Sequence, residues 1–467
     1  MPGLFQHLRG VLGEGVLLLS PLSTWLRVLA TGLLLVVSAS GVARASDFDL
    51  FGVHPIGMAE VSARVAAAED GSACFYNPGG LSLGHGYQFD VSANSVLSRL
   101  EMQGERYGID DPLGGTITVA ASVPLEGALK DRIRVGVAAR AMASGIMHLK
   151  LRDRDSLFYP YYDNRSQRLV AIPAVSVRVL DRVGLGLGFN TLAGVEGPVD
   201  IREGQSRTLE PRIVQEAGTV VRWIAGVRID WSERVRFGIT YRQSFGVPLT
   251  IATRADIAGT PLTFDITKAE AFYDPAAWTL GIRFIPVDQV AFELDASRQR
   301  WSSWEGPVLG IDTTASALSL SSTPSERVFR DTYSIRLGAA WKVKRSETLE
   351  MSLHLGTGYE TPMIDVSVPH GEANLADGAK RMSGVGWSVR FPQVFGRGLR
   401  MSLGVQMHQV GKWHQDKVVC KSLPCPSGTV AGPDAADPST NIGNRGYPSL
   451  NGSGSVFVGA FGVGGDL

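Results

Sequence analysis

Cysteines are the residues of this chain with the greatest potential for redox or metal chemistry, and the sequence holds three of them. Cys420 and Cys425 have four residues between them. In an oxidising compartment this pair predicts a local disulfide that would staple a loop. The alternative is a metal site that also uses His414, but a fourth ligand is missing for the tetrahedral set that zinc takes. Cys74 is left over and is expected to be a buried free thiol.

Histidine and serine offer hydrolytic chemistry, but their spacing matches none of its common motifs. The eight histidines form no H-E-x-x-H pair, and no G-x-S-x-G elbow occurs. His354 and His408 are expected to share a face with polar residues, where a serine on an adjacent strand could complete a nucleophile pair. Ordinary hydrogen-bonded polar residues are the favoured interpretation. We therefore predict no catalytic residue, no metal and no cofactor.

Arginines and glycines provide two weaker signals. Arg132, Arg134 and Arg140 could pair with a ligand carboxylate, although pairing with Asp or Glu side chains of the protein is the commoner case. Glycines alternate through residues 184–188, but the spacing is G-x-G-x-G and no helix follows. A dinucleotide-binding fingerprint is therefore not indicated.

Composition excludes several classes of protein. The chain has 467 residues with 45 basic and 45 acidic side chains, so its formal net charge is zero. This balance argues against a nucleic-acid-binding protein that depends on bulk positive charge. The 55 glycines follow no G-X-Y period, which excludes collagen. With 44% hydrophobic residues the chain can bury a core.

The N-terminal region has the features of a secretory signal peptide. Arg27 precedes an apolar run at residues 28–37, and Ala43-Arg44-Ala45 forms a cleavage site of the A-x-A type. We expect a signal peptide over residues 1–45, with a single membrane anchor as the alternative. No comparable apolar run follows, which excludes a multi-helix membrane protein. Export would place the chain in the bacterial periplasm, the outer membrane or the exterior.

Alternation of apolar and polar residues dominates the chain from residue 86 onward, which predicts β-strands. Between Thr219 and Trp231 every second residue is apolar, and Arg222 lies on the opposite, polar face. The pattern resumes after Ser232-Glu233, where Arg242 lies on the polar face. Fourteen candidate strands result, at residues 86–103, 114–125, 131–150, 167–181, 182–198, 210–231, 234–254, 272–286, 288–305, 330–343, 347–363, 380–392, 398–413 and 451–463.

Three features favour a transmembrane antiparallel β-barrel of about fourteen strands over a soluble sandwich. Many strands exceed the ~9–11 residues that a tilted strand needs to cross a bilayer. Short connections such as 180–182 alternate with long ones such as 306–329, as in outer-membrane barrels. Aromatic residues lie near strand ends, where interfacial girdles form. These are Trp231, Tyr241, Trp278, Trp341, Tyr359, Phe391 and Trp413.

Residues 46–85 do not alternate and predict a separate element, a plug that folds into the lumen. Met58 to Asp70 is rich in alanine and predicts a short helix, and Gly71 would end it. The small residues at 184–188 on the polar strand face would leave room for such a plug. The barrel itself is expected over residues 86–467.

The plug region resembles the FadL family of outer-membrane hydrophobic-compound transporters. The resemblance rests on the alanine-rich segment, on the acidic-Gly-Ser-Ala step at 70–73 and on Asn77-Pro78 followed by Gly79, Gly80 and Leu81. The family usually has alanine after Asn-Pro, where this chain has Gly79, and its members tend to end in an aromatic residue, where this chain ends in Leu467.

Membership would imply a monomer with an N-terminal hatch in the lumen. Long-chain fatty acids or aromatic hydrocarbons would be captured by extracellular loops and would pass to an apolar lumen pocket. They would leave sideways after the hatch moves, through a kink in the third strand, for which Gly136 and Gly145 are candidates. The partners implied are hydrophobic small molecules, outer-membrane lipid and lipopolysaccharide, and the barrel assembly machinery.

Two groups of residues are the candidate ligand contacts. Phe48, Leu50 and Phe51 begin the expected mature chain, and the loop at 157–162 is rich in aromatic residues, including Phe158, Tyr159 and Tyr161. The alternatives are a porin-like or structural barrel without specific transport, and an outer-membrane hydrolase. A transporter should have an apolar pocket beside the hatch end, a porin an open charged lumen, and a hydrolase a Ser–His pair at the wall.

Overall fold

The structure is a computed structural model of the 467-residue chain, and all residues that it describes belong to the unit Arg44–Leu467. It describes residues 48–108, 113–123, 125–127, 130–142, 157–163, 170–196, 199–203, 209–213, 216–257, 260–304, 310–313, 328–365, 374–394, 397–417, 419–420, 430–431 and 449–466. The predicted signal peptide lies outside these ranges. Within them, no helix has the length and apolar character needed to cross a membrane.

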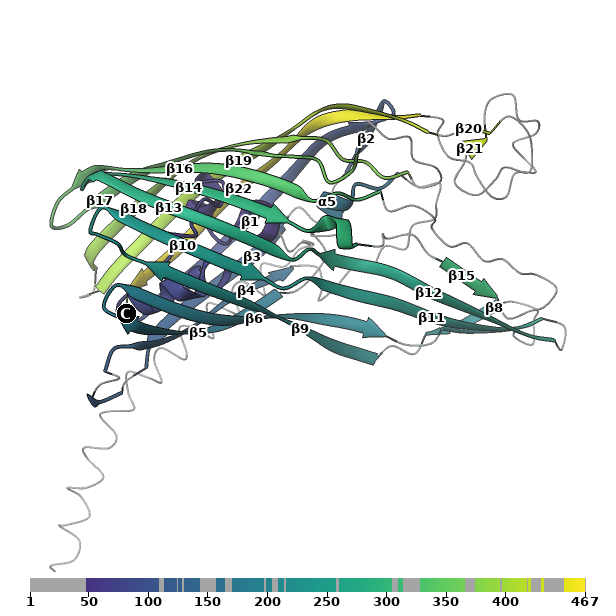
Figure 1. Ribbon diagram of the computed structural model, residues 1–467, viewed down its shortest axis with the longest axis horizontal. Helices are drawn as coiled ribbons and strands as arrows, with labels where there is room; N and C mark the ends of the chain where they lie inside the picture. Colours follow the sequence, from purple (N-terminus) through teal and green to yellow (C-terminus); the bar gives the residue numbers. More distant parts are fainter. Residues whose placement is uncertain are drawn as a thin grey trace, which may run out of the picture. The chain divides into compact units, whose positions relative to one another are not determined.

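The main sheet is a closed antiparallel barrel (Figure 1). The sheet has fifteen strands, of which β2 (Glu105–Tyr107) only extends β1, so that fourteen form the wall. The barrel closes because β1 pairs with β22 on one side and with β3 on the other. The wall strands are β1 (Gln88–Met102), β3 (Leu113–Ser122), β4 (Ile133–Met142), β5 (Val170–Leu180), β6 (Val183–Glu196), β9 (Glu216–Ile229), β10 (Val235–Arg242), β13 (Ala277–Val287), β14 (Val290–Gln299), β16 (Thr332–Arg345), β17 (Glu350–Glu360), β18 (Lys380–Val394), β19 (Arg397–Asp416) and β22 (Ser449–Asp466).

The fourteen-stranded prediction is therefore confirmed, and so is the alternation of short and long connections. Two residues join β5 to β6, at 181–182, whereas residues 243–276 separate β10 from β13. Strands with one lipid face and one lumen face must alternate, which explains why the period of two located them. The last strand continues past the expected residue 463 and pairs with both neighbours up to Asp466.

The outer face of the wall carries exposed apolar side chains, as expected for a surface that meets lipid. Leu280 and Leu403 are 56% and 53% exposed, and Trp231 is 72% exposed at the short-turn end. Trp413 was predicted to belong to the aromatic girdles, and this is wrong, because it is only 7% exposed and packs in an inner aromatic cluster.

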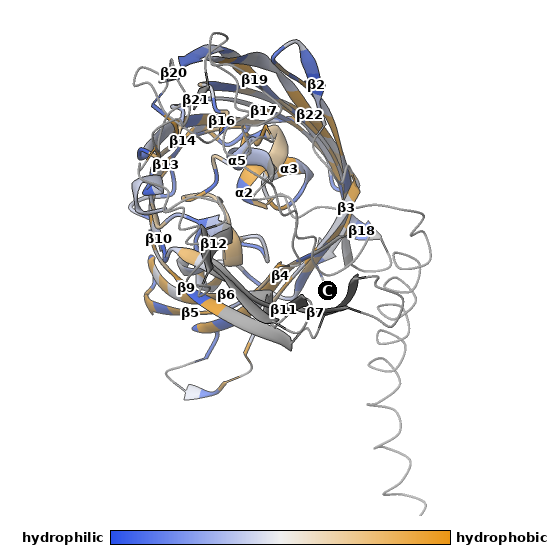
Figure 2. Cartoon of the chain, turned by 90° about the vertical axis from the view of Figure 1, so that its right-hand side faces the viewer, coloured by the Kyte–Doolittle hydropathy of each residue, from blue (hydrophilic) through white to orange (hydrophobic). Residues whose placement is uncertain are grey.

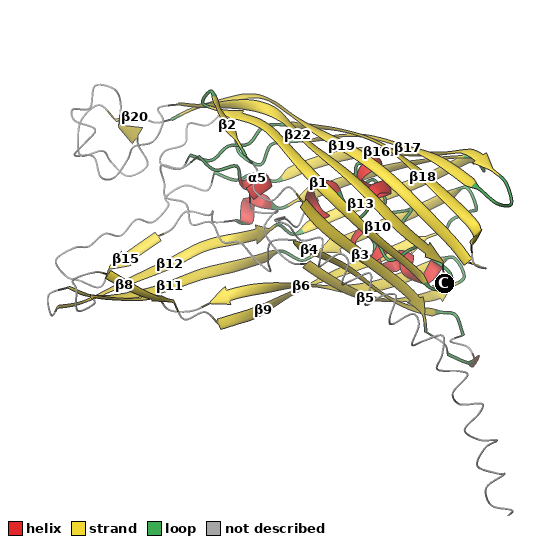
Figure 3. Cartoon of the chain, turned by 180° about the vertical axis from the view of Figure 1, so that it is seen from behind, coloured by secondary structure: helices red, strands yellow, loops and turns green. Residues whose placement is uncertain are grey.

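A second sheet lies beyond the barrel at the end of the long connections (Figure 3). It contains β7 (Val199–Glu203), β8 (Leu209–Ile213), β11 (Phe245–Ile257), β12 (Thr260–Asp274) and β15 (Gly310–Thr313). The sequence predicts connections rather than strands at 200–209 and 255–271, and this is wrong for the described parts of both, since 200–203, 255–257 and 260–271 lie in strands. The β11–β12 hairpin extends the β10–β13 connection, and β7 pairs with β11 in parallel.

Residues 48–86, which we call the hatch, lie inside the ring of strands, as the end-on view of α2 (Phe48–Phe51) and α3 (Pro55–Ala59) shows (Figure 2). Two further short helices follow, α4 (Ala73–Tyr76) and the 3-10 helix η1 (Pro78–Leu83). The single helix predicted for Met58–Asp70 is wrong. Val61 and Ser62 have positive φ angles of 46° and 65°, so the helix cannot continue beyond α3.

The hatch fits because many of the wall residues that face it are glycines. At ten of these an added Cβ would come within 3.0 Å of a hatch atom, which real Cβ atoms do not tolerate. This set, the glycine ring, comes from eight barrel strands. Its members are Gly136, Gly184, Gly186, Gly226, Gly238, Gly281, Gly356, Gly384, Gly386 and Gly404.

We predict that Gly186→Ala destabilises the barrel, because the added methyl would overlap the carbonyl group of Pro78. Overpacking of this kind costs about 1–3 kcal/mol. The measurement is the temperature at which the heat-modifiable band shifts on a gel. Gly459→Ala is the matched control, since nothing lies within 4 Å of its added Cβ. Equal shifts for the two variants would contradict this explanation.

Candidate functional site

The beginning of the hatch and the aromatic loop are distant in sequence but meet inside the barrel. Leu50 and Phe51 belong to one buried cluster with Phe158, Tyr159 and Tyr161. Each of these side chains is at most 9% exposed. Five of the six candidate ligand contacts are therefore neighbours in one apolar assembly, which we call the aromatic cluster.

Short-range contacts fix the aromatic cluster. Two of its rings belong to α5 (Pro160–Asp163), where Tyr161 and Tyr162 lie with ring centroids 5.1 Å apart and ring planes nearly perpendicular. Tyr162 Oη lies 3.3 Å from His408 Nδ1, and the ring of Phe51 lies 4.8 Å from that of His408. The hatch end thus contacts both α5 and β19 through one histidine.

Two tryptophans extend the aromatic cluster and were missed in the sequence. Trp301 and Trp304 are fully buried, and Trp304 stacks on Phe329 with ring centroids 4.5 Å apart. Tyr273 stacks on Trp304 with ring planes 3° apart. The spacing W-x-x-W just after a strand was the available signal.

A buried ion pair lies beside these rings. Lys380 Nζ is 2.6 Å from Asp377 Oδ1, and both side chains are fully buried. The same ammonium lies 3.8 Å from the centre of the Tyr161 ring, in cation–π geometry. Burial raises the pKa of Asp377, although Lys380 opposes the shift.

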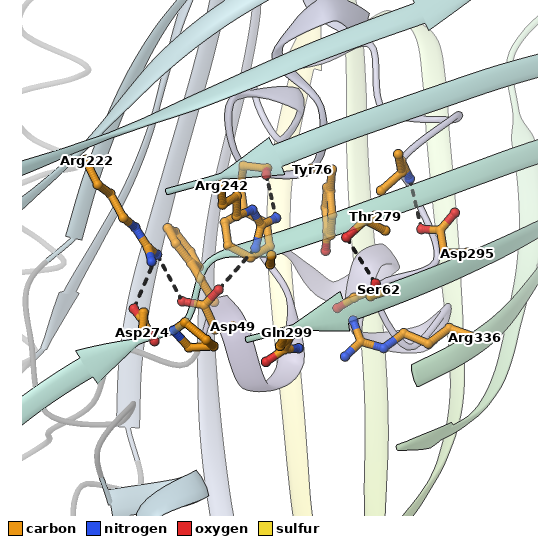
Figure 4. Close-up of a pocket in the computed structure, with 16 residues that line it drawn as sticks. Asp49, Ser62, Tyr76, Arg222, Arg242, Asp274, Thr279, Asp295, Gln299 and Arg336 are labelled. Atoms are coloured by element: carbon orange, nitrogen blue, oxygen red, sulfur yellow. Dashed lines mark hydrogen bonds and ion pairs between the residues drawn. The ribbon is translucent and has the colours of Figure 1, made fainter. Parts of the chain in front are cut away.

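Below Phe48 the lumen is polar. A cavity of about 40 Å³ is lined by Phe48, Phe75 and several charged side chains of the wall, which Figure 4 shows. Arg222 Nη2 lies 3.2 Å from Asp274 Oδ2 and 3.7 Å from Asp49 Oδ2 (Figure 4). This cavity differs from the apolar pocket that we expected beside Phe48 and Phe51.

Phe48 itself packs away from the aromatic cluster. It belongs to a second buried cluster with Phe75, at a ring distance of 5.5 Å, and with Cys74. Cys74 is a buried free thiol, as predicted, and burial raises its pKa. Gly136 lies opposite its sulfur atom, and the pairing of β4 with both neighbours continues through Gly136 without a shift in register.

Some predicted sites lie outside the described residues. These include Gly145 and Cys425, and only the backbone of Cys420 is described, so the predicted disulfide stays a prediction. His414 lies 3.1 Å from Asp416 through its Nε2 atom. Among the described residues, no group of three or more His, Cys, Asp or Glu side chains is arranged to hold a metal ion.

The Asn-Pro-Gly-Gly motif fastens the hatch to the wall. Asn77 Nδ2 donates to the carbonyl oxygens of Val65 and Val227, at 2.9 Å each, and Asn77 Oδ1 accepts from Gly79 N at 3.1 Å. Pro78 begins η1, where its missing N–H costs nothing. Gly79 and Gly80 are both fully enclosed by wall and hatch atoms.

Wall side chains supply further anchors for the hatch backbone. Asp295 Oδ2 accepts from the backbone N–H groups of Arg64 and Val65 at 2.8 and 3.1 Å. Arg134 donates to the carbonyl oxygens of Leu81 and Gly86, at 2.9 Å each. The lumen arginines that we considered for ligand binding therefore include at least one that holds the hatch.

A Ser–His–Glu chain joins the hatch to β17 and β18. Glu60 Oε1 lies 2.7 Å from His354 Nδ1, and His354 Nε2 lies 3.0 Å from Ser388 Oγ. This is the Ser–His contact that a hydrolase requires. The cavity beside Phe48 does not include Ser388 in its lining, however, and neither does a larger cavity at the short-turn end of the barrel. These three hydrogen-bonded residues also take their carboxylate from Glu60 of the hatch. Their clearest role is therefore to anchor the hatch.

We predict that acid weakens this anchor. Burial alone would raise the pKa of Glu60, but Arg64 and His354 lower it from the ordinary 4.5 to about 2. A depressed carboxyl pKa stabilises the folded state above pH 4.5, and that stabilisation is lost as the pH falls towards 2. A loss on the order of 2–3 kcal/mol in unfolding free energy is expected across this window.

The measurement is urea unfolding of the detergent-solubilised protein between pH 5 and pH 2, with the unfolding free energy extrapolated at each pH. Glu60→Gln should remove the part of the pH dependence that this carboxyl contributes, whereas Glu347→Gln, a turn residue for which the structure gives no ion pair, should keep the full dependence. Equal pH profiles for the native chain and Glu60→Gln would contradict this assignment.

Comparison with known proteins agrees with the fold. The family model described as outer membrane protein transport protein (OMPP1/FadL/TodX) matches residues 34–391. A Pseudomonas aeruginosa FadL homologue of known structure is 12% identical, with a TM-score of 0.55 over 89% of this chain and 98% of that chain. The P. putida toluene transporter TodX is 14% identical, with a TM-score of 0.50 over 90% of this chain and 99% of that chain.

The comparison with curated proteins found no match to this sequence. The family match covers more than half of the chain, from residue 34 to residue 391. Its members are bacterial outer-membrane transport proteins, which agrees with a closed barrel whose outer face is apolar. The chain belongs to the OMPP1/FadL/TodX family of outer-membrane transport proteins.

Proposed function

We propose that this protein takes up hydrophobic compounds from outside the cell and passes them into the outer membrane. The observation that carries the proposal is the shared aromatic cluster, in which Leu50 and Phe51 of the hatch pack against Phe158 and Tyr159 of the outer loop. A compound that enters this cluster from outside must contact the hatch end. Capture and hatch movement would therefore be coupled.

Several features support an apolar ligand at the aromatic cluster. Aromatic pairs contribute about 0.5–1.5 kcal/mol beyond the area that they bury, and an incoming ring or alkyl chain can replace such contacts. The rings already present, from Tyr107 to Trp413, pack together in one buried apolar cluster. Such a surface can repack around a guest more easily than a polar network.

The exit is proposed to be lateral, through the wall between β5 and β6. Their pairing includes Ala171 with Thr191 and Ala174 with Gly188, but skips Ile172 and Pro173. Proline has no N–H to donate to the sheet, which accounts for the interruption. Ile172 is buried beside the hatch, so an apolar surface meets the wall at this gap.

An axial exit is less compatible with the lumen. Beneath the hatch, at the short-turn end, lies a cavity of about 690 Å³. Its lining includes Glu69, Asp70, Arg390 and Arg400. An apolar compound gains no hydrophobic free energy when it enters so charged a space, whereas it does gain free energy when it enters lipid. The glycine ring also leaves little space for a porin-like channel beside the hatch.

The first test is uptake of labelled oleate and toluene by cells with and without the protein. Cells that express it should take up at least one compound faster. Phe158→Ala should reduce that uptake about tenfold, if the lost ring contact contributes ~1–1.5 kcal/mol. Leu280→Ala, a change on the lipid face, is the matched control. Equal uptake of both compounds in both strains would refute transport.

The lateral exit makes a separate prediction. Pro173→Val would restore an N–H and favour continuous pairing of β5 with β6. We expect slower uptake by this variant, with unchanged ligand affinity in the purified protein. Tryptophan fluorescence titration measures the affinity, and cellular accumulation measures the rate. Unchanged uptake in Pro173→Val would place the exit elsewhere.

A further inference from the structure

We propose that a row of polar side chains on the outer face of the barrel binds the phosphorylated sugar headgroup of lipopolysaccharide. The row crosses five neighbouring strands, from β17 through β18, β19 and β22 to β1. Its members, which we call the polar row, are Tyr359, Arg381, Gln409, Ser455 and Arg99. The site lies on the surface that meets lipid, so the inference is independent of the proposed uptake through the lumen.

The register of the sheet places the members of the polar row side by side. Tyr359 pairs with Arg381, and Arg381 pairs with Gln409. Gln409 pairs with Ser455, which pairs in turn with Arg99 across the seam of the barrel. Adjacent strands lie ~4.8 Å apart, so the backbones of the two arginines are separated by about 14 Å along the sheet. One row thus carries two cations with an amide and a hydroxyl between them.

Alternation directs these side chains outward. Residues next to the row in the chain face the lumen, since Leu100 and Met382 are 1% exposed and His408 is 0% exposed. Successive side chains of a strand point to opposite faces, so the members of the row point away from the lumen. Both arginines of the row and its glutamine are accordingly exposed, and Tyr359 is 42% exposed.

The polar row lies at the extracellular border of the apolar surface. Tyr359 and Arg381 are each one residue from the end of their strand, where the long connection 361–379 begins. Long connections of outer-membrane barrels are extracellular. Towards the middle of the membrane, the outer face carries Leu97 on β1, Leu355 on β17 and Val385 on β18, at 54%, 47% and 49% exposure. The row is therefore at the level of the headgroups of the outer leaflet.

The two arginines of the row offer positive charge to this level. Within the part of the chain that the structure describes, neither Arg99 nor Arg381 forms an ion pair with a carboxylate. The guanidinium of Arg99 lies 5.7 Å from the centre of the Phe457 ring, which does not neutralise it. Glu101 follows Arg99 on the same face of β1, but it lies opposite a third arginine, Arg106, in the register of β1 with β2. The row therefore favours an anionic lipid.

The chemistry of the row fits a phosphorylated sugar better than a simple phospholipid. Arginine binds phosphate oxygens through charge-assisted hydrogen bonds in a planar fork. The amide of Gln409 and the hydroxyl of Ser455 can each donate to and accept from sugar hydroxyl groups. Lipid A, the membrane anchor of lipopolysaccharide, carries one phosphate on each sugar of a disaccharide. Its two phosphates can meet the two arginines at once, whereas the single phosphate of phosphatidylglycerol can meet only one.

The experiment is titration of the detergent-solubilised full chain with diphosphorylated lipid A, with bound lipid counted by native mass spectrometry. An arginine beside an anionic lipid surface contributes a factor of about five to the affinity. Arg99→Gln and Arg381→Gln should each weaken lipid A binding about fivefold, and the double variant roughly thirtyfold. Binding of phosphatidylglycerol, and of lipid A from which both phosphates have been removed, should be weaker than that of lipid A in the native chain.

Two further variants separate this site from a general effect of charge. Arg345→Gln is the matched control, because Arg345 is 69% exposed but lies at the short-turn end, where β16 ends. It should bind lipid A as the native chain does. Replacing Arg99 and Arg381 by lysine keeps the charge but removes the planar fork, so this double variant should lose less affinity than the double glutamine variant. Heat-modifiable migration shows that each variant is folded.

Three results would overturn the inference: native affinity for lipid A in the double glutamine variant, an equal loss of affinity in Arg345→Gln, or equal affinity of the native chain for lipid A and phosphatidylglycerol. The first would place the lipid elsewhere on the barrel, and the second would reduce the effect to net charge. The third would mean that the row binds any anionic lipid. None of these results would change the expected uptake of oleate or toluene.

Discussion

The contact between hatch backbone and wall backbone at the glycine ring is the constraint on which the rest of this structure depends. Side chains larger than hydrogen at Gly184 or Gly404 would hold the two surfaces apart. Close approach brings backbone groups of the hatch within reach of Asp295 and Arg134 of the wall. It also brings the side chain of Asn77, in the hatch, within reach of the Val227 carbonyl oxygen of the wall. Buried backbone groups need such partners, because an unsatisfied one costs about as much as a lost hydrogen bond.

The same contact sets where a ligand can act. The middle of the hatch is held on the wall by many hydrogen bonds. Among its first residues, Leu50 and Phe51 pack in the aromatic cluster, and Asp49 pairs with Arg222 and Arg242. Parts of a protein with fewer buried polar contacts open at lower free energy. On the proposed function, the end of the hatch is therefore the element that a small molecule would move without dismantling the barrel.

Much of the barrel could be predicted because lipid imposes alternation on every crossing strand. Residues 380–392, for example, were expected as a strand and are Lys380–Val394 in the structure. The β11–β12 hairpin lies beyond the barrel wall, where no lipid face enforces a period. Most of β11, up to residue 254, was expected as a strand, whereas 255–271 was expected as a connection. In the hatch, alanines such as Ala63 and Ala66 signalled a helix but serve as small residues against the wall, both at 0% exposure.

The site was harder to predict than the fold. Phe51 and Tyr159 were each chosen for their aromatic or apolar character, but their meeting depends on where the hatch enters the barrel. Arg222 and Arg242 were placed correctly on the polar face of their strands, yet nothing in the local sequence linked them to Asp49. Such pairings need the three-dimensional path of the hatch, which no local period encodes.

Closure of the barrel has a consequence for how the chain folds. The seam joins β1 to β22, so Gln88 pairs with Asp466, and the hatch that precedes β1 contacts strands around the lumen. A hatch enclosed on all sides cannot enter a finished cylinder sideways, and its closest contacts form only once the surrounding strands are paired. We therefore expect folding of the hatch and pairing of the final seam to be coupled. Because both depend on contacts between distant parts of the chain, we expect assembly to be slow.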